Sequence, residues 1–157
     1  MIRIGHAWDV HKLVEGRRLY LGGVLVESEF GLLGHSDADV VLHAVAESLL
    51  GSLALGDLGT FYPDNSEKTK GMDSKIILEE CYQRVKEYGY HLANIDLTIY
   101  SENIKVAPIR ERIIKSISNI LKIDTAFVSV KATTYEKMGF IGRGEAIACE
   151  CVCLVEK

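Results

Sequence analysis

Residues 37–54 form the most apolar stretch of the chain, and this stretch limits the folds open to it most strongly. Ser36, followed three residues later by Asp39, is typical of a helix start with carboxylates in the first turn. A helix that is apolar on all sides must be buried on most of them. The residues concerned are Val40, Val41, Leu42, Ala44, Val45, Leu49, Leu50 and Leu53. We therefore expect a buried helix over 37–54.

Strands and further helices surround this helix in the sequence. We expect strands over 2–12 and 18–27, with a turn at Glu15–Gly16, a bulge or bend at Gly22–Gly23 and a glycine-punctuated loop over 31–34. Helices are expected over 74–88 and 108–121, and strands over 92–102, 126–135 and 146–156. Because helices and strands alternate but adjacent strands occur at both ends, the pattern predicts an α+β fold with a mixed sheet. No linker or repeat divides the chain, so we expect a single domain over 1–157.

The charge pattern excludes two kinds of partner. The formal net charge is −4, and no run of Lys and Arg occurs, so we expect no nucleic-acid partner. No apolar run reaches the ~18 residues of a membrane span, so we expect no membrane partner. The N-terminus enters a strand-like pattern at once, without a signal peptide, which predicts a cytoplasmic protein.

The cysteines favour core packing. Cys149, Cys151 and Cys153 alternate along an expected strand and share one face, and Cys81 lies on an expected helix. A metal–thiolate site is the alternative, but zinc ligands usually leave two or more residues between cysteines. Free cysteine packs as a small apolar residue.

Asp9 and His11 are two candidate metal ligands. On a strand, side chains two apart point to the same side, so this carboxylate and imidazole project together. Two ligands do not make a site, and both side chains can simply be exposed polar groups. His43 is the best candidate for a third ligand, because Asp39, His43 and the preceding His35 crowd one end of a buried helix. Burying them is costly without a cation or a phosphate. The set fits zinc and also non-haem iron(II).

Three further polar features remain open at this stage. The stretch 61–71 is either a mobile loop that folds over a ligand or a plain surface connection. Glu136 is either a hard oxygen ligand for magnesium or a solvated turn residue. Glu150 has apolar neighbours on its strand, so either it pairs with Arg143, within the chain or across a subunit interface, or it reaches water at a sheet edge.

Several separate motifs, in order along nearly the whole chain, resemble the 2-C-methyl-D-erythritol 2,4-cyclodiphosphate synthase family. They are Gly5–His11, Gly34–Asp39 with His43, Gly56–Asp57, Phe61–Asp64, Lys131–Phe140 and Gly142–Glu145. The resemblance implies a mixed four-stranded sheet with helices packed on one face and a small N-terminal hairpin. It also implies a homotrimer whose sheets face a central cavity, with active sites between neighbouring subunits.

The resemblance implies a phosphorus–oxygen lyase of non-mevalonate isoprenoid precursor biosynthesis. Its substrate would be 4-diphosphocytidyl-2-C-methyl-D-erythritol 2-phosphate, and its products the 2,4-cyclodiphosphate and CMP. By this resemblance Asp9, His11 and His43 hold zinc or another divalent transition metal. Glu136 holds Mg²⁺ or Mn²⁺. His35 and Thr134 stabilise the transition state.

The resemblance also assigns residues to the substrate. Asp9, His11 and His35 would contact it beside the metal, and an isoprenoid diphosphate would bind in the central cavity at Phe140 and Arg143. Expected at the erythritol and its phosphates are Ser36, Asp57, Gly59 and, from the 62–66 loop, Tyr62, Asp64 and Ser66. Expected at the cytidine diphosphate are Ser101 and Lys105 from the 101–106 segment, together with Thr133, Thr134 and Glu136.

Two departures from the family pattern affect the nucleotide pocket. Ile104 stands where the family commonly has proline, which would loosen the pocket, and Tyr135 replaces a usual threonine. Two rival functions use the same residues. A non-haem iron oxygenase would need a 2-oxoacid or pterin pocket, for which the sequence carries no signal. A non-catalytic trimer would bind a phosphorylated metabolite without releasing CMP.

Overall fold

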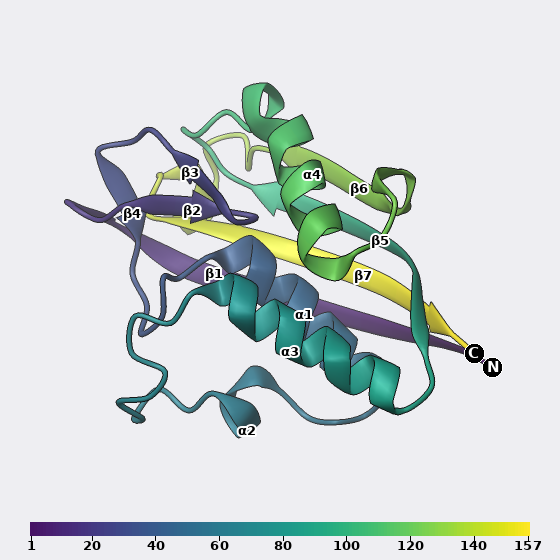
Figure 1. Ribbon diagram of the computed structural model, residues 1–157. Coiled ribbons are helices and arrows are strands. Elements are labelled where there is room, and N and C mark those ends of the chain that lie inside the picture. The colour runs from purple at the N-terminus through teal and green to yellow at the C-terminus, as the bar shows by residue number, and fades with distance from the viewer.

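The computed structural model describes residues 1–157, which fold as two sheets with helices packed on one face of the larger sheet (Figure 1). The strands are β1 (Ile2–Glu15), β2 (Leu19–Leu21), β3 (Val24–Val26), β4 (Phe30–Leu32), β5 (His91–Tyr100), β6 (Val128–Thr133) and β7 (Ala146–Glu156). The helices are α1 (Val40–Ser52), α2 (Leu58–Phe61), α3 (Ser74–Glu87), α4 (Arg110–Leu121) and α5 (Gly139–Gly142), with 3-10 turns at Ala107–Ile109 and Thr125–Phe127. The predicted helices over 74–88 and 108–121 and the three later strands are thus confirmed within a few residues.

The main sheet is mixed, as predicted, but it has five strands in the order β4-β1-β7-β5-β6. All neighbours are antiparallel except β5 and β6. The expected count of four was wrong because β4 lies in the segment assigned to a glycine loop. Gly31 permits close backbone approach there, since a Cβ at this position would lie 2.4 Å from the carbonyl oxygen of Arg17.

Residues 18–27 form a hairpin instead of one strand. Leu21 pairs with Val24 across a two-residue turn, and Gly22 and Gly23 have φ values of +63° and +78°. Positive φ at both central positions is the geometry of the type I′ hairpin turn, which glycine adopts without strain. The predicted bend at these glycines is therefore a complete chain reversal, and the hairpin β2–β3 is a separate two-stranded sheet.

The helix predicted over 37–54 begins later than expected. Ala38 has a φ of +58°, and Asp39, not Ser36, is the N-cap of α1. The Asp39 carboxylate accepts hydrogen bonds from Val41 N and Leu42 N, at 3.2 and 3.0 Å. It also accepts from Gly22 N and Gly23 N, at 2.9 and 2.6 Å, so it ties the β2–β3 turn to the start of the helix.

Helices α1, α3 and α4 lie on one face of the main sheet (Figure 1). Helix α1 packs on β1 and β7, and α3 packs on the outer side of α1. As its apolar composition requires, α1 is almost entirely buried within the main core. The four cysteines are free and buried, which confirms the prediction of core packing.

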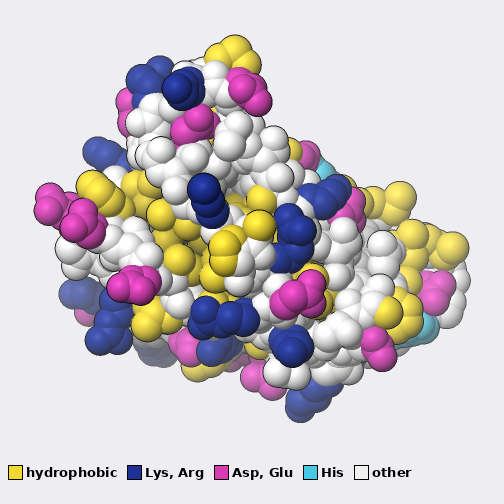
Figure 2. Space-filling model, turned by 90° about the horizontal axis from the view of Figure 1, so that it is seen from above, with side chains coloured by type: hydrophobic (Ala, Val, Ile, Leu, Met, Phe, Trp, Pro, Cys, Tyr) yellow, Lys and Arg dark blue, Asp and Glu magenta, His cyan; other side chains and the backbone are white.

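The opposite face of the sheet carries uncovered apolar side chains. Ile2, Ile4 and Trp8 of β1 are 64%, 66% and 43% exposed, and Val152 of β7 is 42% exposed. Because alternate residues of a strand point to opposite faces, Gly5, Ala7, Asp9 and His11 face α1 instead. Figure 2 shows another side of the molecule, seen from above, where side chains of both charges surround a group of hydrophobic ones. None of the helices combines the length and hydrophobicity that crossing a bilayer requires.

Candidate metal centre

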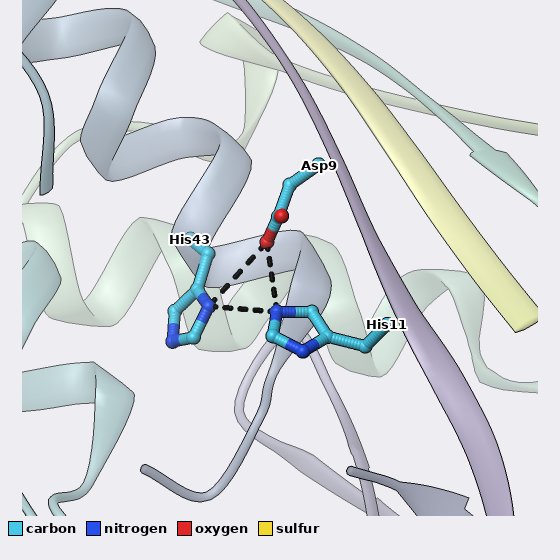
Figure 3. A group of neighbouring side chains, drawn as sticks. All are labelled: Asp9, His11 and His43. Carbon is cyan, nitrogen blue, oxygen red and sulfur yellow. Dashed lines mark hydrogen bonds and ion pairs between the residues drawn. The ribbon is translucent and has the colours of Figure 1, made fainter. Parts of the chain in front are cut away.

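Strand β1 and helix α1 bring three predicted ligands together. Asp9 and His11 project from the face of β1 that α1 covers, and His43 lies in the first turns of α1 (Figure 3). Asp9 Oδ2 lies 3.0 Å from His11 Nε2 and 3.4 Å from His43 Nδ1, and the two ring nitrogens are 3.2 Å apart. Among the His, Cys, Asp and Glu side chains, only this group of three is close enough to share one metal ion.

These separations fit a tetrahedral metal ion. Zinc binds imidazole nitrogen and carboxylate oxygen at about 2.0–2.2 Å, which places neighbouring ligand atoms of a tetrahedron roughly 3.3–3.5 Å apart. The observed 3.0, 3.2 and 3.4 Å lie at or slightly below this range. Three protein ligands leave a fourth position open, as catalytic zinc sites do. The chemistry of the donor set and its spacing therefore both fit a divalent transition metal.

The other nitrogen of each imidazole is held from behind. His11 Nδ1 is 2.9 Å from the carbonyl oxygen of Leu33. His43 Nε2 is 2.9 Å from Ser74 Oγ and 3.1 Å from Ser36 Oγ. Such outer partners fix the orientation of metal-binding histidines. Both rings are consequently aimed at Asp9.

Electrostatics reinforce the pairing of Asp9 with the histidines. Burial alone would raise the pKa of Asp9, but hydrogen bonds and charge from His11 and His43 outweigh it and hold this pKa far below 3.8. Burial alone would lower the pKa of His11, yet the Asp9 carboxylate raises it above 6.5. The carboxylate is therefore ionised throughout the physiological pH range.

A polar pocket of about 280 Å³ opens beside the three ligands. Its lining brings together eight of the predicted site residues. These are Asp9, His11, His35, Ser36, His43, Gly59, Tyr62 and Asp64. Ser66 joins them through its backbone, because His35 Nε2 donates to its carbonyl oxygen at 2.8 Å. Asp57 is the N-cap of α2, just before Gly59, and its carboxylate accepts from Thr60 N at 2.9 Å.

The segment 61–71 lies against this pocket through Tyr62, Asp64 and Thr69. Gly71 N donates to His35 O at 2.7 Å. The guanidinium carbon of Arg84 lies 4.3 Å from the centroid of the Phe61 ring. The segment is thus more than a plain surface connection. Its mobility stays a prediction.

The remaining predicted residues lie elsewhere in the chain. Five of them follow or lie at the ends of β5 and β6, and none lines the pocket beside Asp9. These are Ser101, Lys105, Thr133, Thr134 and Glu136. Ser101 N donates to Thr133 O at 3.1 Å. Glu136 is exposed, has a φ of +51°, and donates from its N–H to Thr134 Oγ1 at 3.3 Å.

Phe140 and Arg143 form a third location. Phe140 lines a shallow hollow with Val10, Lys12, Glu145 and Ala146. Arg143 pairs with Glu145, with Nε 2.7 Å from the carboxylate.

Within the chain Glu150 has other partners than the predicted Arg143. Glu150 accepts from Tyr100 at 2.7 Å and lies 2.9 Å from His6 Nε2. Strand β7 is also central in the sheet, so Glu150 does not lie at a sheet edge.

Two acidic residues near these sites were missed. Glu47 lines the pocket one helical turn after His43, and that spacing of four was a usable signal. Burial first, and then the charges of Asp9 and Asp57, raise the pKa of Glu47. Glu102 accepts from Tyr135 N and Lys137 N at 3.1 and 3.2 Å, on either side of Glu136. No local pattern marks that second contact, because it joins two separate loops.

The fold is α+β with a mixed sheet, and its first strand and first helix bring two histidines and a carboxylate together beside a pocket. These features define a class of protein that can hold a metal ion next to a bound small molecule. The model of the YgbB family matches residues 2–156. The chain belongs to the YgbB family.

Curated relatives match over the full length. A protein of Leptospira interrogans named 2-C-methyl-D-erythritol 2,4-cyclodiphosphate synthase is 51% identical and covers 100% of this chain and 99% of its own. A Geobacillus protein of the same name is 50% identical, again over 100% of this chain and 99% of its own.

Solved structures agree with the fold. The bifunctional IspDF of Campylobacter jejuni has a TM-score of 0.95 at 37% identity, covering 99% of this chain and 42% of that longer one. IspF of Plasmodium falciparum, in a CDP complex, has a TM-score of 0.86 at 37% identity, covering 98% of this chain and 95% of its own.

Proposed function

We propose that this chain is a 2-C-methyl-D-erythritol 2,4-cyclodiphosphate synthase. It would convert 4-diphosphocytidyl-2-C-methyl-D-erythritol 2-phosphate to the cyclic diphosphate and CMP in non-mevalonate isoprenoid precursor biosynthesis. The observation that carries the proposal is the convergence of Asp9, His11 and His43 beside a polar pocket, in a family with the named relatives above. The enzyme would act as one domain over 1–157 in the cytoplasm, where free thiols like its four cysteines persist.

The reaction needs no protein nucleophile. An oxygen of the 2-phosphate attacks the β-phosphorus, and the bond from this phosphorus to the bridging oxygen breaks, so that CMP departs with the electron pair. Ring closure is intramolecular, and positioning therefore supplies much of the acceleration. Asp9, His11 and His43 would hold zinc or another divalent transition metal, and Glu136 would hold Mg²⁺ or Mn²⁺. The positive charge of these ions would neutralise and align the phosphates.

His35 and Thr134 would donate hydrogen bonds to the developing charge. Thr134 Oγ1 accepts from Glu136 N, which leaves its own proton free for a phosphate oxygen. His35 Nε2 already donates to Ser66 O, so His35 must either leave that carbonyl or donate from Nδ1 as an imidazolium. We assign Ser36, Asp57, Gly59, Tyr62, Asp64 and Ser66 to the erythritol and its phosphates.

The complete site would lie between subunits of a homotrimer. Thr134 and Glu136 lie outside the pocket of their own chain, so a neighbour's copy would have to supply them. Ser101, Lys105 and Thr133 would hold the cytidine diphosphate at the same junction. The uncovered apolar face of β1 and β7 supports association, because a large exposed apolar patch commonly marks an interface. The sheets would then face a central cavity, where Phe140 and Arg143 would bind an isoprenoid diphosphate.

The function is tested by incubating the protein with the cytidylyl substrate, zinc and magnesium. Phosphorus NMR should show the cyclic diphosphate and CMP appearing in equal amounts. His43→Ala should lose zinc retention and turnover together. His91→Ala, at an exposed histidine on β5, is the matched control and should keep both.

Each rival predicts a different result. Bound but unreacted substrate would identify a non-catalytic binding protein, and iron-dependent consumption of oxygen and a 2-oxoacid would identify an oxygenase. A zinc-free but active His43→Ala variant would contradict the ligand assignment.

The intersubunit site has its own test. His43→Ala and Glu136→Ala protomers are each expected to be inactive alone. Refolding them together should restore activity, because some junctions then combine an intact His43 with an intact Glu136. No recovery in mixed trimers would mean that both residues must come from the same chain, which would contradict the intersubunit site.

A further inference from the structure

Two residues outside the metal ligands form a chain of hydrogen bonds behind His43. Ser74, the first residue of α3, is fully buried, and its Oγ lies 2.9 Å from His43 Nε2. The Asp37 carboxylate accepts from Ser74 Oγ and also from Ser74 N at 3.0 Å. A third donor, Asp39 N, lies 3.1 Å from Asp37 Oδ1. Asp37 therefore faces three hydrogen-bond donors.

The direction of these hydrogen bonds determines which nitrogen of His43 carries the proton. An ionised carboxylate can only accept, so the single proton of the Ser74 hydroxyl goes to Asp37. Ser74 Oγ can then only accept a hydrogen bond from His43. The proton of a neutral His43 must accordingly sit on Nε2, and Nδ1 keeps the lone pair that faces Asp9 and His11.

We infer that Asp37 and Ser74 are positioning residues that hold His43 in the Nε2–H tautomer, so that Nδ1 is free to bind a metal ion. The inference rests on the metal centre in the proposed function. His11 is held in the corresponding way by the Leu33 carbonyl, which can only accept a hydrogen bond from Nδ1. For His11 the backbone suffices, whereas for His43 two side chains set the tautomer.

The tautomer needs an external constraint because the alternative is also favourable. A proton on His43 Nδ1 would point toward Asp9 Oδ2, 3.4 Å away, and would occupy the position of the metal. Ser36 cannot decide between the two forms. Its Oγ accepts from Ala38 N, so its own proton is free to reach a bare Nε2, and its remaining lone pair can accept from a protonated one.

Two variants break the chain at different points. Ser74→Ala removes the hydroxyl that accepts from His43. Asp37→Ala removes the carboxylate that accepts from Ser74 Oγ, so the Ser74 hydroxyl is then free to donate to His43 Nε2. Ser48→Ala is the matched control, because Ser48 is equally buried and loses only hydrogen bonds to Val45 O and Cys151, away from the site.

The tautomer can be read without metal or turnover. Imidazole ¹⁵N NMR of the metal-free protein, at about pH 8.5 where imidazoles are ordinarily neutral, should show wild-type His43 protonated on Nε2. Ser74→Ala and Asp37→Ala should gain the Nδ1–H form, and chelator competition should show a roughly ten- to hundredfold loss of zinc affinity. Ser48→Ala should match the wild type in both measurements.

An Nδ1–H resonance for His43 in the wild type would overturn the inference, whether or not any variant folds. Unchanged tautomer and zinc affinity in both variants would do the same. Failure of the proposed function would look different: zinc would bind and His43 would hold its tautomer, but no CMP would be released.

Discussion

The backbone of Gly5 on β1 lies directly against the carbonyl group of Ser48 on α1. A Cβ at Gly5 would be 1.8 Å from Ser48 O and 2.9 Å from Cys153 Sγ. Strand and helix therefore approach as closely as their backbones allow. His43 lies on the same helix and Asp9 on the same strand, so this approach sets how near these two candidate metal ligands come to one another.

Gly5→Ala should push α1 away from β1 and separate His43 from Asp9. We expect a loss of about 1–3 kcal/mol in the free energy of unfolding, as for other overpacked cores, together with weaker zinc binding. Gly51→Ala on the facing helix is the control, because its Cβ would meet only His6 O at 3.9 Å. That variant should be neutral or slightly stabilising. Chemical denaturation and zinc titration of both proteins check this, and equal behaviour would refute it.

Asp39→Asn should destabilise the protein strongly. All four contacts of this buried carboxylate are backbone N–H donors, so one oxygen replaced by an amide N–H leaves a donor facing a donor. The expected cost is about 2–4 kcal/mol. Asp124→Asn, at an exposed cap that contacts only Ala126 N, should cost under about 1 kcal/mol. Thermal denaturation measures both, and comparable losses in the two variants would contradict the assigned role of Asp39.

In the metal-free protein, Asp9 and His11 should make a pH-dependent contribution to the free energy of unfolding. Asp9 has a lowered pKa, so its contribution is present above about pH 4 and is lost as the pH falls through the lowered value. His11 has a raised pKa, so its contribution is complete below about pH 6.5 and is lost as the pH rises through the raised value. Between these two pH limits, the Asp9–His11 pair should therefore add on the order of 1 kcal/mol to the free energy of unfolding.

Thermal melts of chelator-treated wild type and Asp9→Asn across about pH 4–8 test this window. The variant's curve should lack the added stability, and Asp124→Asn should retain it. A difference between wild type and Asp9→Asn that does not change with pH would contradict the pairing.

Glu102→Gln should weaken the second proposed metal site without touching the first. Its carboxylate holds the N–H groups of Tyr135 and Lys137, and the positive φ values of Glu136 and Lys137 depend on that support. We expect the magnesium concentration for half-maximal turnover to rise about tenfold, with zinc retention unchanged. Glu111→Gln in the first turn of α4 is the control. An unaltered magnesium requirement would separate Glu102 from metal binding.

Local patterns were sufficient for most elements and for singling out three candidate ligands, whose assignment to one metal ion came from the family resemblance. The apolar stretch that became α1, the period-two spacing of Asp9 and His11, and the position of His43 each follow from residue types close in sequence. Their convergence was a prediction that the 3.0–3.4 Å separations confirm.

Contacts between distant segments were not predictable in this way. Strand β4 was missed because a glycine such as Gly31 is typical of a loop. In the structure, Gly31 instead allows the strand backbone to lie close to the carbonyl oxygen of Arg17. The helix was expected to start at Ser36, but its N-cap is Asp39, whose carboxylate also accepts two hydrogen bonds from the distant Gly22–Gly23 turn. Glu150 on β7 contacts Tyr100 of β5 and His6 of β1, and these contacts depend on the strand order, in which β5 and β1 lie on either side of β7.

The two ends of the chain meet at one point of the surface (Figure 1). The amino group of Met1 donates to the Lys157 carbonyl at 2.6 Å, while Asp9 lies about 25 Å further along β1 at the usual strand rise. A short linker between the ends would therefore close the backbone into a ring without strain. Circular permutants opened at an exposed loop, such as the one around Gly16, should keep the three candidate metal ligands in place.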